Sequence, residues 1–265
     1  IFRDRQKQWA IGEYTMLTVV CATMQIERIE TLRSIVSVAQ SHPAVQNVII
    51  IWNQPGVLPQ EVADLARLPI RKGNHMSRVT VIHTEFNSLN NRYDPNLPIH
   101  TGAVMILDDD LIITSQTITC AFNVWKSDPS RLYSFGLGRY VTSEKYGGYE
   151  LPGGGSEIGD ERTNFLLPRL VFHRSFLGVY FEDANQKIRE YVDAQGAHCD
   201  DIAFASVITK YTQKPMVHIP APSKDSGAKT GLGLVANRVK LRNECARHII
   251  SMLEWTMPTV EAINC

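Results

Sequence analysis

Three adjacent aspartates follow an apolar run in the middle of the chain. The run covers residues 103–107, and the aspartates are Asp108, Asp109 and Asp110. Neighbouring carboxylates raise one another's pKa unless a cation offsets their repulsion. A Mn²⁺ or Mg²⁺ ion would do so, because such ions typically take one or two carboxylates and complete their shell with water and phosphate oxygens. The triplet therefore predicts a Mn²⁺ (or Mg²⁺) site that also receives a phosphorylated ligand.

The same triplet admits other interpretations. It could be an acidic surface turn that only caps the helix expected after it. It could belong to a phosphatase with an aspartate nucleophile, but that motif is D-x-D-x-[TV], and the fifth position here is Ile112. It also satisfies the D-x-D of nucleotide-sugar transferases, in which a metal stabilises the departing nucleoside diphosphate. The rest of the chain must decide among these three.

The elements around the triplet indicate an α/β fold. Unbroken apolar runs predict buried strands, and segments with helical spacing lie between them. The expected strands are 16–23, 45–52, 78–84 and 103–107, and the expected helices are 27–42, 59–68 and 114–127, the last with Thr114 or Ser115 as its N-cap. This alternation is typical of an open sheet whose ligands bind beyond the carboxyl ends of its strands. The three aspartates lie at such an end.

The second half of the chain has a less regular pattern. Two glycine-rich segments, 146–160 and 220–238, are expected to be long loops. Helices are expected over 182–195, 199–212 and 244–255. The helix over 199–212 opens with two adjacent aspartates, and either Asp200 or Asp201 is expected to be its N-cap.

Composition excludes some classes of function. Lys+Arg and Asp+Glu are equal at 27 each, so no overall basic field would recruit nucleic acid. No apolar run approaches the ~20 residues that cross a bilayer. The chain opens at Ile1 with a polar stretch, and we interpret residues 1–14 as the remnant of a stem, with any membrane anchor or signal outside the sequence.

Five cysteines are present without any C-x-x-C spacing, which disfavours a zinc knuckle or a thioredoxin-like motif. Cys21 and Cys120 lie in apolar stretches and are expected to be small core residues. Cys199 and Cys245 lie in polar surroundings, and they could pair in an oxidising compartment.

Six segments together resemble the exostosin-type glycosyltransferases, glycosyltransferase family 64. They occur in the family's order and at its spacing, and they span most of residues 15–258. They are VIIIWNQP (48–55), EFNSLNNRY (85–93), VMILDDDLII (104–113), AFNVWKSDPSRL (121–132), HCDDIAFASVIT (198–209) and LRNEC (241–245). The combination of SLNNR, DDD and CDDIA is specific, whereas each alone would be weak.

The resemblance implies a GT-A fold, with a donor-binding part over 15–138 and a smaller acceptor-binding part over 139–265 continuous with it. It implies a metal-dependent transferase that retains anomeric configuration. The donor would be a UDP- or GDP-sugar carrying N-acetylhexosamine or mannose, and the acceptor a glycan or a glycosphingolipid. It also implies a Golgi or endoplasmic reticulum lumenal location and a possible homo- or hetero-oligomer with related glycosyltransferases.

Residue by residue, the resemblance assigns three groups of side chains. The expected donor contacts are Asn53, Asn87, Arg92, Asp108, Asp109 and Arg28, and the expected metal ligands are Asp110 and Asp108. The expected catalytic residues are Asp201 beside the reacting sugar, Asp200 at the acceptor and Arg242 at the leaving diphosphate; the two aspartates could exchange roles. Asn90 and Asn91 would only shape their loop. Cys199 and Cys245 match the family's disulfide.

The chain departs from the family pattern at two places. Family members often have Thr-Tyr-x-Arg after the first strand, but here the chain reads ATMQIER, so Arg28 is displaced by an apparent insertion. In the second half, Pro168 and Arg169 stand where Thr-Gly is usual. The second departure keeps an alternative open, in which the chain is a non-catalytic partner that binds glycan or another glycosyltransferase. The intact DDD, CDD and LRNEC segments favour the enzyme.

Overall fold

The computed structural model describes residues 15–68, 77–135, 138–143, 148–150, 163–167, 169–195, 199–219, 221, 223–225, 238–263 and 265. Its centre is an eight-stranded sheet in the order β13-β11-β6-β10-β4-β1-β2-β3. The strands are β1 (Leu17–Thr23), β2 (Val45–Trp52), β3 (Arg78–His83), β4 (Ala103–Asp108), β6 (Tyr133–Ser134), β10 (Leu170–His173), β11 (Val217–His218) and β13 (Glu261–Ala262). Only β10 runs antiparallel to its neighbours in this sheet. The predicted α/β class with a Rossmann-like mixed sheet is confirmed.

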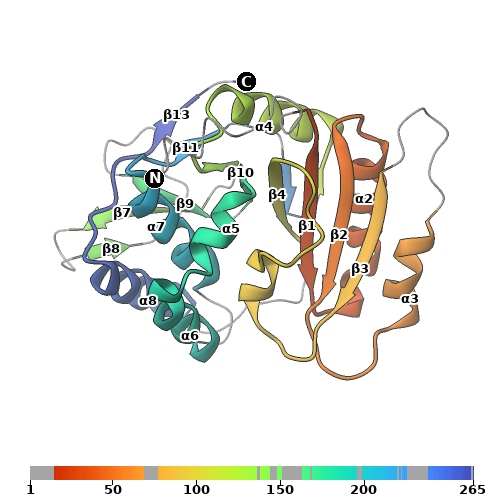
Figure 1. Ribbon diagram of the computed structural model, residues 1–265, viewed down its shortest axis with the longest axis horizontal. Coiled ribbons are helices and arrows are strands. Elements are labelled where there is room, and N and C mark those ends of the chain that lie inside the picture. The colour runs from red at the N-terminus through yellow and green to blue at the C-terminus, as the bar shows by residue number, and fades with distance from the viewer. Residues whose placement is uncertain are drawn as a thin grey trace.

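Helices cover both faces of the sheet, as Figure 1 shows. One face packs against α2 (Ile29–Ser41) and α4 (Ser115–Ser127), and the other against α5 (Ser175–Tyr180) and α7 (Asp200–Thr212). Further out lie α6 (Gln186–Ala194) and α8 (Arg238–Leu253). All residues from 200 to 209 in α7 are buried, so this helix is enclosed by the sheet and its neighbouring helices.

The first half of the chain follows the sequence-based prediction closely. Thr114 caps α4 as expected, with its hydroxyl accepting from the backbone N–H of Thr117. The helix predicted over 27–42 opens instead with the 3₁₀ turn η2 (Ile26–Arg28), and the one predicted over 59–68 is split into α3 (Gln60–Ala63) and η3 (Asp64–Arg67). The 3₁₀ turn η4 (Leu89–Tyr93) was not predicted.

The second half corrects several predictions. The segment 146–160 contains β8 (Gly148–Glu150), which pairs with β7 (Gly138–Ser143), itself paired with β9 (Thr163–Leu167). The segment 220–238 contains β12 (Ser223–Asp225), paired with β5 (Leu111–Ile113). The remainder of both predicted loops lies largely outside the described residues. Helix α8 starts at Arg238 and ends at Leu253, earlier at both ends than predicted, and the helix predicted over 182–195 consists of η5 (Asp183–Asn185) and α6.

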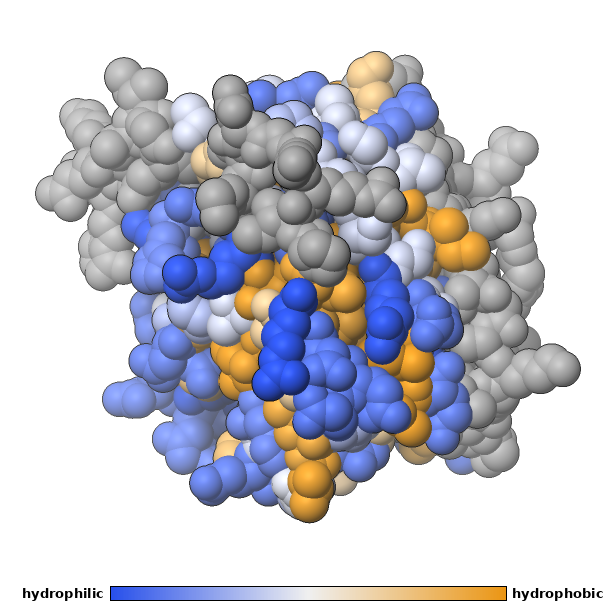
Figure 2. Space-filling model, turned by 90° about the vertical axis from the view of Figure 1, so that its right-hand side faces the viewer, coloured by the Kyte–Doolittle hydropathy of each residue, from blue (hydrophilic) through white to orange (hydrophobic). Residues whose placement is uncertain are grey.

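Strand β3 forms one edge of the sheet. Val79 on it is buried, whereas Val81 and Ile82 are only partly covered. Figure 2 views the molecule from this side and shows apolar surface between hydrophilic side chains. Exposed polar side chains stand at both ends of the strand: the charged Arg78 at its start and His83 at its end. A charged side chain on an edge strand is a common way to protect the edge from pairing with another chain.

Two disulfides connect distant parts of the chain. Cys199 pairs with Cys245, as the resemblance implied, and their Cα atoms lie 5.9 Å apart. Cys120 is buried in the core, as expected, but it also pairs with Cys265, which was not predicted. That pairing could not be read from the sequence, because the two residues are 145 positions apart. Cys21 is buried and unpaired, as expected.

Among the described residues, no helix combines the length and the apolar character that crossing a bilayer requires.

Candidate active site

The candidate site lies at the point in the sheet where successive strands switch from one side of β1 to the other. Strand β1 lies between β2 and β4 and pairs in parallel with both. The chain runs outward from β1 through β2 to β3 and then crosses to β4 on the other side of β1. The carboxyl ends of these strands meet at one edge, which is where open α/β sheets bind ligands. Thr23 ends β1 and Asp108 ends β4, so the first of the three aspartates lies at this switch point.

The three aspartates have different environments. The Asp109 side chain is only 9% exposed, whereas those of Asp108 and Asp110 are 28% and 33% exposed. Asp109 accepts a 2.7 Å hydrogen bond from the Thr23 hydroxyl and is paired with Arg28. Burial raises the pKa of the Asp109 carboxyl, although Thr23 and Arg28 act in the opposite direction. Asp109 is therefore held by the protein, and the outer two carboxylates are the more accessible.

Arg28 belongs to this cluster despite its displaced position in the sequence. It ends the 3₁₀ turn η2 that follows β1, and its guanidinium also lies 3.3 Å from the Asp110 carboxylate. The turn brings the side chain back over the end of the sheet. Arg28 thus lies beside the predicted donor-binding aspartates in spite of the apparent insertion.

Arg92 connects the aspartate triplet to α7. Its Nη1 donates to Asp108 at 3.1 Å, and its Nε lies 3.3 Å from Asp200. The side chain is 9% exposed. Burial alone would lower the pKa of Arg92, but Asp200 and Asp108 raise it above its ordinary value, so the guanidinium stays charged. A buried cation thus holds together carboxylates that come from two separate elements.

Asp200 is a buried carboxylate at the start of α7. Burial raises its pKa to about 6, with Arg92 opposing this shift and Asp201 adding to it. The Tyr93 hydroxyl donates a long, 3.5 Å hydrogen bond to it. The N-cap of α7 is Cys199, and neither aspartate caps the helix as predicted. Both occupy the first turn instead, where the helix dipole favours negative charge.

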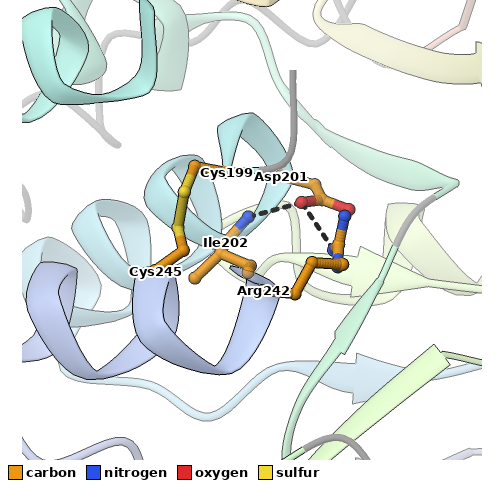
Figure 3. The surroundings of a disulfide bond; sticks show 5 residues. All are labelled: Cys199, Asp201, Ile202, Arg242 and Cys245. Carbon is orange, nitrogen blue, oxygen red and sulfur yellow. Dashed lines mark hydrogen bonds and ion pairs between the residues drawn. A yellow bond between two sulfur atoms is a disulfide. The ribbon is translucent and has the colours of Figure 1, made fainter. Parts of the chain in front are cut away.

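Asp201 is paired with Arg242 of α8, as Figure 3 shows. The Arg242 Nη2 lies 2.8 Å from one carboxylate oxygen and 2.7 Å from the other, and the backbone N–H of Ile202 donates to Asp201 at 2.8 Å. The Cys199–Cys245 disulfide joins the same two helices close to this pair. The resemblance assigned Asp201, Arg242 and the disulfide separately, and the structure brings them into one unit.

Asn53 follows β2, and its backbone N–H donates to the Thr23 carbonyl at 2.7 Å, while Asn87 lies just before η4. Asn53 is 1% exposed, and its amide nitrogen donates to Asn87 at 3.1 Å and to the Ser88 carbonyl at 2.9 Å. Its amide oxygen accepts from Asn91 and Thr84. These bonds use the full capacity of the amide. Asn53 therefore shapes the loop, and the exposed Asn87 is the more accessible of the two predicted donor contacts.

The sequence was compared with known proteins. The model of the "Glycosyl transferase family 64 domain" matches residues 17–262. The chain belongs to glycosyltransferase family 64. The predicted exostosin-type resemblance is confirmed, and the aspartate triplet is thereby part of a glycosyltransferase domain.

Three relatives illustrate how far this chain differs from known proteins. Exostosin-like 2 of Mus musculus is 25% identical over 238 residues, which are 86% of this chain and 70% of that protein. Glycosylinositol phosphorylceramide mannosyl transferase 1 of Arabidopsis thaliana is 24% identical over 85% of this chain and 69% of its own length. Human exostosin-2 is 26% identical over 88% of this chain, but only 31% of its own length is matched. Among solved structures, Staphylococcus aureus TarS 1-349 aligns with a TM-score of 0.46 and 14% identity, over 73% of this chain and 55% of its own.

The carboxylates at the switch point fit a divalent cation only in part. Asp108 and Asp110 are the accessible oxygen ligands, and within the described ranges no group of three His, Cys, Asp or Glu side chains converges as a ready metal cage. A two-carboxylate site suits Mn²⁺ or Mg²⁺ when phosphate oxygens and water complete the shell. Five aspartates face three arginines across the whole cluster, so it carries an excess of two negative charges when all are ionised. A divalent cation would balance that excess.

Sequence reasoning missed two residues of the site. Thr23 ends β1 and holds Asp109, and Tyr93 stacks on Phe204 with 4.3 Å between ring centroids while bonding Asp200. The sequence could have indicated Thr23, because it is a polar residue at the carboxyl end of a buried strand, where ligands bind in such sheets. Tyr93 directly follows Arg92, but only the fold shows that both reach the first turn of α7.

Proposed function

We propose that this chain is a metal-dependent, retaining glycosyltransferase that uses a nucleoside-diphosphate sugar. The observation that carries the proposal is the position of Arg92, which joins the aspartates at the end of β4 to the aspartates that open α7. The first group suits a donor diphosphate with its cation, and the second suits the reacting sugar. One buried guanidinium brings the two within a few ångströms of each other.

Asp108 and Asp110 would hold the Mn²⁺ or Mg²⁺ ion. When bound, the ion supplies positive charge that offsets the growing negative charge on the leaving diphosphate. Asp109 does not face it as a ligand in this proposal, because its carboxylate is already held by Thr23 and Arg28. Arg28 remains beside the donor, where it keeps the orientation of Asp109 and Asp110.

The arginines and the second aspartate pair act on the transfer itself. The bond between the anomeric carbon and the phosphate oxygen breaks, a bond to the acceptor oxygen forms on the same face, and the acceptor proton leaves with the diphosphate. Arg92 and Arg242 stabilise the diphosphate charge as it develops. Asp201 lies next to the positively charged sugar centre, held by Arg242, and Asp200 orients the acceptor.

The proposed donor and acceptor classes rest on the family resemblance, and one relative is named as a glycosylinositol phosphorylceramide mannosyl transferase. The sugar is N-acetylhexosamine from a UDP-sugar or mannose from a GDP-sugar, and the acceptor is a glycan or a glycosphingolipid. Two disulfides support a site of action in an oxidising compartment, consistent with the lumen of the endoplasmic reticulum or Golgi. Assembly with related glycosyltransferases belongs to the same proposal.

Asp110→Asn tests the proposal. The purified variant should retain the fold but lose transfer and donor hydrolysis by at least about 100-fold, because removal of a charge-stabilising group at a reacting centre typically costs ~10²–10³ in kcat. Asp64→Asn is the matched control: Asp64 is also paired with an arginine, Arg67 at 2.9 Å, but it lies on the surface. Full activity of folded Asp110→Asn would contradict the mechanism. Absence of donor binding by the unmodified protein would favour the non-catalytic partner.

A further inference from the structure

The η4 turn connects the active site with the helices outside it. At its inner end, Arg92 and Tyr93 contact Asp200, and Arg92 also contacts Asp108. At its outer end, Asn90 points away from these carboxylates toward α5 and α6. Only Asn91 separates Arg92, which contacts both groups of carboxylates, from Asn90, which attaches the turn to α5 and α6.

The Asn90 side chain is hydrogen-bonded through both its amide nitrogen and its amide oxygen. Its amide nitrogen donates to the Asp193 carboxylate at 2.9 Å and to the Arg189 carbonyl at 3.0 Å, and its amide oxygen accepts from the Tyr180 hydroxyl at 2.7 Å. Its backbone N–H donates to the Ser88 hydroxyl at 3.0 Å. The residue is 5% exposed. Loss of this side chain would remove the acceptor of the buried Tyr180 hydroxyl, and leaving a buried donor unsatisfied is costly.

The partners of Asn90 are themselves fixed. The Tyr180 ring packs edge-on against Tyr93 at 5.5 Å and against Phe204 at 5.4 Å between centroids. Ser88, the N-cap of η4, donates its hydroxyl proton to Asp193. Ser88 and Asn90 are therefore both bonded to Asp193 of α6. The Tyr180 ring, whose hydroxyl bonds Asn90, also packs against Tyr93, the residue after Arg92.

We propose that Asn90, held by Tyr180 and Asp193, is a positioning residue that fixes Arg92 between Asp108 and Asp200 during sugar transfer. This inference rests on the proposed function, because it assigns Asn90 a part in that reaction. Without the attachment, η4 moves with the loop that precedes it, and Arg92 shifts relative to both carboxylates. A displacement of about 1 Å at such a site can cost ~10²-fold in rate.

Asn90→Ala tests the inference when compared with Asn185→Ala. The control removes a single amide bond, from the half-buried Asn185 to the Val179 carbonyl at 2.8 Å, and this bond joins the start of α6 to α5 and not to η4. We expect Asn90→Ala to lower kcat by roughly 10- to 100-fold with a smaller change in KM for the donor, because Arg92 acts mainly on charge that develops in the transition state. Asn185→Ala should lower the melting temperature but leave kcat within about twofold of the unmodified enzyme.

Tyr180→Phe is the second variant, for the case in which Asn90→Ala does not fold. It removes one hydroxyl, keeps the ring packing, and should lower kcat by about 3- to 10-fold without a matching change in KM. If the folded Asn90 or Tyr180 variants have the same kcat as Asn185→Ala, Asn90 is only structural and the inference is wrong. Asp110→Asn, assayed alongside, separates the two ideas, since its full activity would instead contradict the proposed function.

Discussion

Each aspartate of the site differs from its neighbours through its partners. Asp109 is buried against Thr23 and Arg28, while Asp108 and Asp110 stay accessible at the end of β4. In α7, Asp201 has Arg242 on both oxygens, whereas Asp200 shares Arg92 with Asp108. Burial and the nearest guanidinium therefore give the aspartates different roles. Asp109 is a structural anchor, Asp108 and Asp110 are candidate metal ligands, and Asp200 and Asp201 are candidate catalytic groups.

The pKa of Asp200 predicts an acid limit of activity. Burial raises this pKa to about 6, so the carboxyl is ionised at pH 7 and becomes neutral as the pH falls through 6. Neutral Asp200 no longer balances Arg92 or orients the acceptor. We expect kcat/KM to fall below about pH 6, with a tenfold loss per pH unit well below the pKa. A pH profile measured at saturating Mn²⁺ checks this, and a constant kcat/KM down to pH 5 would contradict it.

For single residues, the sequence predicted which side chains belong to the site but not which partners they contact. The aspartate triplet could be assigned to a ligand-binding edge because it follows a buried strand. The attachment of Asn90 to Tyr180 and Asp193 could not be predicted, since it joins segments that are 90 and 103 residues apart. The partners of Asn53 could not be predicted either, because only the structure shows that its side-chain amide bonds to Thr84, Asn87, Ser88 and Asn91.

Helices α7 and α8, which carry the proposed catalytic residues, are joined by a disulfide. The disulfide from Cys199 to Cys245 spans 46 residues and lies two residues before Asp201 and three after Arg242. Arg242 can therefore reach Asp201 without relying on helix packing alone. The other disulfide, from Cys120 on α4 to Cys265, holds the segment that follows β13.

The two disulfides should have different effects on catalysis. Cys199→Ser/Cys245→Ser and Cys120→Ser/Cys265→Ser should each lose about 2–4 kcal/mol of unfolding free energy. Only the first pair of substitutions should also lower kcat, because it frees α8 to move relative to Asp201. Urea unfolding and steady-state kinetics of both double variants give the comparison. Equal kcat in the two variants would show that helix packing alone positions Arg242.

Elements of the second half were predicted less well than those of the first. Long apolar strands such as β2 and amphipathic helices such as α2 have a clear period, so their presence was evident. Strands of two or three residues, such as β6 and β8, have no period to detect. Their pairing is decided by neighbours that are distant in the chain, and for β8 the glycine-rich surroundings suggested a loop.

The whole molecule is organised around one sheet to which both halves of the chain contribute. Strands β10, β6, β11 and β13 from the second half extend the sheet beyond β4. Phe204 of α7 lies in the core between the halves: it is fully buried and packs against Tyr93, Phe172 and Tyr180. Within the described residues, the predicted donor and acceptor parts thus share one hydrophobic core. We expect this shared core to fix the position of Asp108–Asp110 relative to Asp200 and Asp201.

Phe204→Ala tests whether this core stabilises both halves of the chain, so that they unfold together. We expect a loss of about 3–5 kcal/mol of unfolding free energy, because truncation of a buried phenylalanine removes apolar contacts and leaves a cavity. Unfolding in urea should remain a single transition, coincident by far-UV circular dichroism and by tryptophan fluorescence. Phe86→Ala is the control, since Phe86 is 62% exposed and should change stability by no more than about 0.5 kcal/mol. Two separated transitions would indicate halves that fold independently.

Thermal unfolding with nucleotides tests the central claim most directly. The unmodified protein would be heated with UDP or with GDP, each in Mn²⁺ and in EDTA. A ligand that binds only the folded state at a hundred times its Kd adds ~2.7 kcal/mol of stability, which is easily seen in the melting temperature. We predict that one nucleotide raises the melting temperature in Mn²⁺ and has little effect in EDTA; UDP would indicate a UDP-sugar donor, and GDP would indicate GDP-mannose. No shift with either nucleotide would contradict the donor site at Asp108–Asp110 and the proposed transfer reaction.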